Sequence, residues 1–163
     1  MSEVLAENTQ NSLQAIPRVP TREQIERLHE EVAKLPQTEV DTQHFFVPGM
    51  YCRRVLHPAG VVIVGKVHKA PHFFLCASGE VMCWSEKGML HLKPGDVIES
   101  KPGTKRAAYA LVDAVIVTIH KTDLTDLDAI EEELIEPDEK YLFDSNNKLK
   151  KAVLEGTKAL EVV

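Results

Sequence analysis

Short hydrophobic runs separated by turn residues fill the middle of this chain, between His44 and His120. The breaks carry proline and glycine, as at Pro48-Gly49 and Pro94-Gly95. Runs of about four to eight residues bounded in this way are typical of antiparallel strands, whereas a helix needs a longer periodic segment. Strands of this kind are predicted at 50–57, 61–68, 72–77, 80–84, 88–92, 96–100, 105–111 and 114–120. So many short strands predict an all-β fold with flanking helices, built on a single antiparallel jelly-roll β-barrel.

Helical patterns flank the predicted barrel. Thr21 and Gln24 have the spacing of a capping box, and hydrophobic residues then recur at helical intervals up to Pro36. A second short helix is expected over 126–134, capped by Asp123 or Thr125. We therefore divide the chain into a flexible N-terminal arm (1–19), an amphipathic helix (20–36), the barrel (40–137) and a C-terminal helical tail (138–163).

Composition excludes several classes of protein. The formal net charge is −6, which argues against a nucleic-acid binder, since such proteins present a basic surface. No hydrophobic run approaches the roughly 18 residues of a membrane span, and the first residues do not resemble a signal peptide. The three cysteines lack metal-ligand spacing and lie in strand-like runs, so we expect buried reduced thiols.

A group of histidines is the main candidate site. His68 and His72 flank a predicted turn between two neighbouring strands. His120 ends the last strand, which is expected to form a hairpin with the strand at 105–111. Because side chains alternate along a strand, inward-facing strands would bring all three imidazoles to one mouth of the barrel. Neutral imidazoles bind divalent metals, so we predict a site for Zn, Fe, Ni or Mn. Surface positions for the three histidines remain the alternative.

The other histidines have simpler interpretations. We expect His29 to be a solvated residue on the polar side of the first helix. His57 is interpreted as a surface residue at a strand end, and His91 as an outward-facing residue of a hairpin. The position of His44 is left open.

Three cations near the histidines have two interpretations. Lys66 lies in a hydrophobic run, and Lys105 and Arg106 begin a predicted strand. They could be solvated or paired charges, with Glu99 or Asp96 as the partner of Lys66. They could also face a small anionic ligand, for which Arg106 would offer a bidentate guanidinium.

Residues 58–120 resemble a cupin barrel, and more narrowly the small cupin-like proteins of phages and prophages. The resemblance rests on Gly65-Lys66-Val67-His68-Lys69 with His72, on Lys101-Pro102-Gly103-Thr104-Lys105-Arg106, and on Thr118-Ile119-His120. In the general cupin pattern, His72 takes the position of an acidic ligand, Lys66 that of the first histidine, and Arg106 that of the last. The resemblance implies a cytoplasmic protein of a bacterial host, or a virion protein, with an altered set of metal ligands.

Three functions follow as hypotheses. The first is a cupin-fold protein that binds a divalent metal or a small anionic ligand at the barrel mouth, with catalysis undecided. The second is a non-catalytic phage structural or accessory protein that contacts other phage structural proteins. The third is a sponge that sequesters a nucleotide signal. Self-association as a dimer is also expected, because the helix stripe of Ile25, Leu28, Val32 and Leu35 is hydrophobic.

Overall fold

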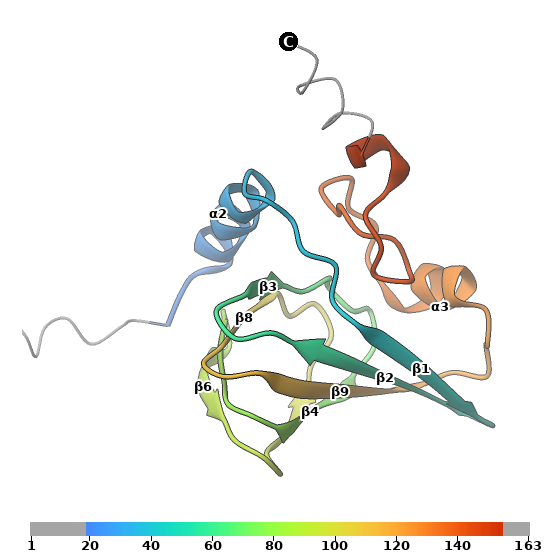
Figure 1. Cartoon of the computed structure of the whole chain (residues 1–163). Coiled ribbons are helices and arrows are strands. Elements are labelled where there is room, and N and C mark those ends of the chain that lie inside the picture. Colours follow the sequence, from blue (N-terminus) through green and yellow to red (C-terminus); the bar gives the residue numbers. More distant parts are fainter. Residues whose placement is uncertain (1–18, 155–163) are drawn as a thin grey trace, which may run out of the picture.

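The computed structural model describes residues 19–154 as two antiparallel β-sheets that face each other, with helices outside them (Figure 1). One sheet has five strands in the order β1-β2-β9-β4-β7, and the other has four in the order β3-β8-β5-β6. The strands are β1 (Thr42–Val47), β2 (Met50–His57), β3 (Val62–Val64), β4 (His72–Ser78), β5 (Val81–Ser85), β6 (Gly88–Leu92), β7 (Val97–Ser100), β8 (Arg106–Ala110) and β9 (Ala114–Lys121). This is the predicted jelly roll.

Side-chain alternation decides what the two sheets enclose. Alternate residues of β4 and β9, such as Cys76 and Ile116, face the opposite sheet and pack there. From the other sheet, Val81 and Ala110 complete a core that is purely hydrophobic at one end of the barrel. Toward the other end the inward residues become polar, and this is where the histidines lie.

The pairing of the strands differs from our expectation in two places. The run 61–68 forms only a three-residue strand, which pairs with β8 and not with β4. Likewise β9 pairs with β2 and β4, so β8 and β9 are not the hairpin that we expected. In both cases consecutive strands cross between the two sheets, a connection that short turn signals do not distinguish from a hairpin.

The first strand, β1, was missed by the sequence analysis. Its hydrophobic residues Phe45 and Val47 face outward and are half exposed, so it lacks the buried alternation of a core strand. Its position is set by pairing along its whole length with residues 50–55 of β2.

The two helices pack around the mouth of the sheets. Helix α2 (Arg22–Ala33) begins with the expected capping box of Thr21 and Gln24. Helix α3 (Leu127–Leu134) is capped by Asp126, not by Asp123 or Thr125, because the Asp126 carboxylate accepts the amide of Ala129. Neither of these two described helices has the length and hydrophobicity needed to cross a membrane.

The two terminal regions of the chain lie only partly within the described residues. The predicted flexible arm before residue 19 lies outside the described residues, as does the predicted tail after residue 154. Within the tail, 151–154 form one helical turn. The part before it is tied to the barrel, since Asn147 donates to the Thr42 hydroxyl and Lys148 pairs with Glu39.

Several single-residue expectations have clear outcomes. All three cysteines are free; Cys76 and Cys83 are buried, while Cys52 is half-buried on the outer face of β2. His57 is not a surface residue, as we had expected, because its side chain turns inward and contacts the Val61 carbonyl at 2.7 Å. His91 does face outward, where it contacts Glu80.

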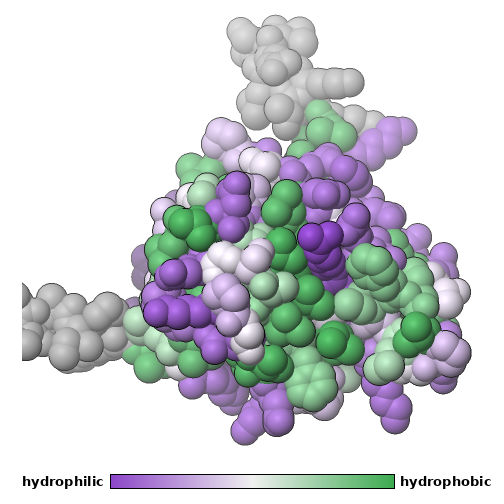
Figure 2. All heavy atoms as spheres, turned by 60° about the horizontal axis from the view of Figure 1, so that its bottom comes forward, coloured by the Kyte–Doolittle hydropathy of each residue, from purple (hydrophilic) through white to green (hydrophobic). Residues whose placement is uncertain are grey.

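The outer face of the five-stranded sheet carries exposed hydrophobic residues. Phe45, Phe73 and Val97 are 50%, 47% and 58% exposed. Figure 2 looks toward this side and shows a band of hydrophobic residues across it. The hydrophobic stripe predicted for the first helix is only partly buried, since Ile25 is buried while Leu35 remains 60% exposed. The dimer stays a prediction.

The turn before β5 gives a test of this architecture. Gly79 has a φ of +76°, and a Cβ there would meet the Asp113 carbonyl at 2.4 Å and Ala114 Cα at 2.6 Å. We expect Gly79→Ala to lower the free energy of unfolding by about 3 kcal/mol or more, measured by urea denaturation. The added Cβ would overlap with the backbone of Asp113 and Ala114, and the positive φ would also be strained for alanine. Gly60 is the matched control, with a φ of +78° and open space around it. Gly60→Ala should cost only about 1–2 kcal/mol, and equal losses would contradict the packing described.

Candidate metal centre

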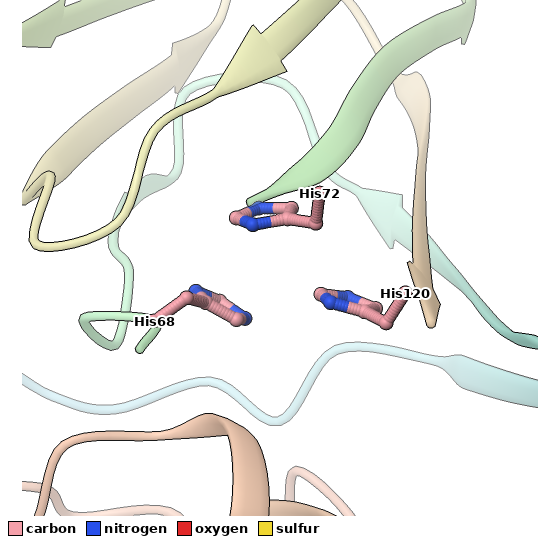
Figure 3. A group of neighbouring side chains, drawn as sticks. All are labelled: His68, His72 and His120. Atoms are coloured by element: carbon pink, nitrogen blue, oxygen red, sulfur yellow. The ribbon is translucent and has the colours of Figure 1, made fainter. Parts of the chain in front are cut away.

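Three imidazoles converge from three separate segments (Figure 3). His72 begins β4, His120 lies near the end of β9, and His68 follows β3 on a segment outside the sheets. Ring centroids are 4.1 Å apart for His68 and His72, 4.7 Å for His72 and His120, and 5.0 Å for His68 and His120. One nitrogen from each ring lies within 4.8 Å of the others. The structure therefore brings together the three histidines that the sequence suggested.

The segment that carries His68 is held by the chain after α3. His68 forms an isolated β-bridge with Ile135, and the amide of Lys69 donates to the Leu134 carbonyl at 2.8 Å. The amide of Val67 donates to the Tyr141 hydroxyl at 2.9 Å. His68 is thus positioned by residues remote in sequence, whereas His72 and His120 are positioned by the five-stranded sheet.

Burial keeps the three imidazoles neutral. It is the main cause that lowers the pKa of His68 to about 2, of His72 to about 4 and of His120 to about 3. The other rings of the cluster and the guanidinium of Arg53 lower the pKa of His68 further. A neutral imidazole is the form that binds a metal ion.

The neighbours of the rings leave one nitrogen without a partner. Nδ1 of His72 is buried and has no hydrogen bond to any described residue. His120 Nε2 lies 2.9 Å from the Thr118 hydroxyl, and the His120 ring stacks on Tyr51 at 5.6 Å. Tyr51 is fixed in turn by a 2.7 Å hydrogen bond between its hydroxyl and His44 Nδ1. His44, which the sequence left open, thus supports the site from β1.

The imidazoles line a cavity of about 500 Å³ between the sheets and the segments that cover their mouth. Hydrophobic side chains from α2, β2, β3 and α3 form much of its wall, among them Val32, Val55, Ile63 and Leu134. A cavity of this size is within the range of small-molecule sites.

Of the three predicted cations, one faces the cavity unpaired by any carboxylate. Arg106 lines the cavity, stacks on Phe74 at 4.8 Å and donates to the Ser100 hydroxyl at 3.3 Å. Lys66 also lines it but is paired with Glu131, so neither Glu99 nor Asp96 is its partner. The ammonium of Lys66 also donates to the Phe143 carbonyl.

Lys105 points the other way, because neighbouring residues alternate between the faces of a strand. Its ammonium is fully buried beneath α2, 3.1 Å from His29 Nδ1 and 3.9 Å from Glu26. His29 is therefore a buried residue and not the solvated one that we expected. Glu26, His29 and Asp138 have ligand atoms close enough to share a metal ion, but the Lys105 ammonium already supplies the positive charge there.

Arg53 is the residue that the sequence analysis missed. It lies on β2, faces inward and lines the same cavity as the histidines. The alternation Tyr51, Arg53, Val55, His57 on β2 is the signal that could have found it, since all four face inward.

The donor set fits a divalent metal ion. Zn, Fe and Ni accept neutral imidazole nitrogens as ligands, and here two of the rings are buried and the third, His68, is half-buried. Three protein ligands leave a position open on the ion. Two nitrogens that share one zinc at about 2.1 Å are at most about 4.2 Å apart. The observed separations, all within 4.8 Å, need only small side-chain rotations to meet this limit.

No family model and no curated protein sequence matches this chain. Similar folds occur among solved structures. Salicylate 1,2-dioxygenase from Pseudoaminobacter salicylatoxidans is 12% identical with a TM-score of 0.50, and the match covers 67% of this chain and 32% of that one. KdgF from Halomonas sp. is 17% identical with a TM-score of 0.48, covering 57% and 86%. A cupin superfamily protein from Desulfitobacterium hafniense is 13% identical with a TM-score of 0.47, covering 55% and 84%.

The two-sheet topology is that of a jelly roll with flanking helices, and the likeness to salicylate 1,2-dioxygenase, at a TM-score of 0.50, agrees with it. At such low identity the comparisons show the fold and leave the function open. They give no support to the narrower resemblance to phage proteins. The virion hypothesis that depends on it therefore remains a prediction.

The neutral imidazoles predict how stability depends on pH. In the unfolded chain these histidines take up protons near pH 6.5, whereas in the folded chain they do so only near pH 4 and below. The unfolded state thus binds more protons in this window, so stability should fall as pH drops from about 6.5 toward 4. Urea denaturation of metal-free protein at several pH values measures this. A His68→Gln/His72→Gln/His120→Gln variant should lose less stability over the same window, and equal slopes would contradict the buried cluster.

A second prediction concerns Lys105. We expect Lys105→Ala to lower the free energy of unfolding by about 3–5 kcal/mol, because it removes one member of a buried charged cluster. Metal binding should be unchanged, as Lys105 does not line the cavity. The exposed Lys101 is the control, and Lys101→Ala should change stability by less than about 0.5 kcal/mol. A loss of metal binding in the folded Lys105→Ala variant would contradict this separation of roles.

Proposed function

We propose that this protein binds one divalent metal ion through His68, His72 and His120, and that the ion and the cavity together hold a small anionic ligand. The observation that carries the proposal is the convergence of two buried imidazoles and the half-buried His68, with a buried nitrogen of His72 that has no hydrogen-bond partner. An unsatisfied buried polar atom costs free energy, and a ligand that fills its lone pair removes that cost.

The chain's own residues prepare the site in three ways. Burial keeps the imidazoles neutral, so no proton has to leave before an ion binds at neutral pH. Thr118 and Tyr51 fix the orientation of His120, as supporting residues do around many metal ligands. Hydrophobic side chains form much of the cavity wall, which lowers the polarity of the surroundings of a bound ion. A bound ion would supply Lewis-acid character to a ligand in this cavity.

An anionic ligand follows from the charge of the donor set. Three neutral ligands leave the full charge on a divalent ion, in contrast to a set that includes a carboxylate. Arg106 adds a further positive charge to the same cavity. An anion that completes the coordination would offset both charges.

Metal analysis of protein purified without an affinity tag tests this proposal. We expect about one equivalent of divalent metal per chain, or uptake of one equivalent when Zn, Ni or Fe(II) is added to the metal-free protein. His72→Ala should weaken binding by at least tenfold, since two ligands remain where three were available. His72→Glu should restore binding, because a carboxylate is a good ligand in the same position.

His91→Ala is the matched control, since His91 faces solvent on the other sheet, where its imidazole lies 2.8 Å from the Glu80 carboxylate. It should bind metal as the parent does. Less than about a tenth of an equivalent in the parent, with no uptake on addition, would overturn the metal proposal. Unchanged affinity in His72→Ala would assign the cluster a purely structural role.

A further inference from the structure

Arg53 is a positively charged side chain in the wall of the cavity, and the carboxylate that acts on it, Glu131, is already paired with Lys66. Among residues 19–154 its guanidinium makes no hydrogen bond and no ion pair. Arginine has five N–H donors and is usually paired when it is taken out of water. Burial lowers the pKa of Arg53, which reflects the cost of holding this charge inside the protein.

The guanidinium of Arg53 lies beside the histidine cluster. Arg53 pairs with Thr118 across β2 and β9, and Tyr51, two residues earlier on the same face, pairs with His120. The positive charge of Arg53 also lowers the pKa of both His68 and His120. Arg53 is therefore next to the imidazoles, on the five-stranded sheet.

Arg106 supplies a second positive charge from the opposite sheet. Its polar contact is with the neutral hydroxyl of Ser100, and its plane lies over the ring of Phe74. Its charge lowers the pKa of His72. The two arginines thus act on different histidines of the cluster, one from each sheet.

The acidic residues of the cavity wall are already engaged. Glu131 is paired with Lys66, and Asp144 accepts the backbone amides of Asn146 and Lys148. The chain as a whole is acidic, with a net charge of −6, so an unneutralised pair of arginines is a local feature and not a consequence of composition. The two guanidiniums are left for a ligand.

The rest of the wall indicates what that ligand carries besides its negative charge. Away from the histidines, the cavity is lined mainly by aliphatic side chains. They include Val32, Val40, Val61, Ile63, Leu134 and Leu142. A fully polar anion would leave this surface in contact with water, whereas a hydrophobic group would cover it.

We propose that Arg53 and Arg106 bind the carboxylate of an amphipathic organic acid, whose hydrophobic part fills the aliphatic end of the cavity. A planar carboxylate suits guanidinium groups, which donate paired hydrogen bonds in a fixed plane. The proposal deepens the proposed function, because a bound metal ion would be a third anchor for the same carboxylate. It does not require the metal, since the two arginines are present without it.

Isothermal titration calorimetry tests the proposal with 3-phenylpropanoate as the probe, on both metal-free and zinc-loaded protein. We expect saturable binding, at least tenfold tighter than that of acetate, which lacks the hydrophobic part. The neutral 3-phenylpropanamide should bind at least tenfold more weakly than the acid, because it cannot accept charge-assisted hydrogen bonds in the same way.

Arg53→Gln should weaken binding of 3-phenylpropanoate at least tenfold while the zinc stoichiometry stays the same. Arg54→Gln is the matched control, since Arg54 is the next residue on β2, faces outward and donates to Gln43. It should bind the probe as the parent does. If Arg53→Gln fails to fold, Arg53→Lys keeps the charge and should retain weaker binding of the probe.

The outcomes separate this inference from the metal proposal. Binding of the probe to metal-free protein that depends on Arg53, with no uptake of metal, would support the carboxylate site and overturn the metal site. Normal zinc uptake with no saturable binding of 3-phenylpropanoate would overturn the carboxylate site alone. Equal affinities in Arg53→Gln and Arg54→Gln would also overturn it.

Discussion

The two-residue alternation of the strands is the constraint on which the rest of this structure depends. On β2, β4 and β9 the residues with functional side chains fall on the same inward parity as the core. A shift of one residue on β9 would send His120 outward and bring Ile119 inward. The same rule separates Arg106 from Lys105, which are adjacent in sequence yet serve the cavity and the helix packing. The alternation thus decides which polar side chains of these strands face the cavity.

Much of the fold could be predicted from the sequence, because turn signals and short hydrophobic runs are local features. Thr21 and Gln24 marked the start of α2, and the glycine and proline breaks marked most strands. The pairing of the strands was harder to predict from the sequence, since a connection that crosses between the sheets and a hairpin use the same turn residues. β1 was missed because its hydrophobic residues are exposed, so its pattern does not report burial.

The site was found in part for a related reason. Imidazoles are rare enough that His68, His72 and His120 stood out, whereas Arg53 lies beside Arg54 and the sequence does not mark which of the two faces inward. Burial of Lys105 and His29 depends on contacts with residues far away in sequence. Only the packing of α2 shows that Lys105 and His29 share one buried cluster.

The attachment of His68 has a further consequence. Among the described residues, His68 alone of the three imidazoles lies on a segment held by the end of α3 and the residues after it, through Leu134, Ile135 and Tyr141. A ligand that binds all three rings would therefore also stabilise the docking of that segment on the barrel. By thermodynamic reciprocity, a docked segment would raise the affinity of the three rings for the ligand. The segment after α3 and the interior of the barrel are in this way energetically coupled, and His68 is the residue that connects them.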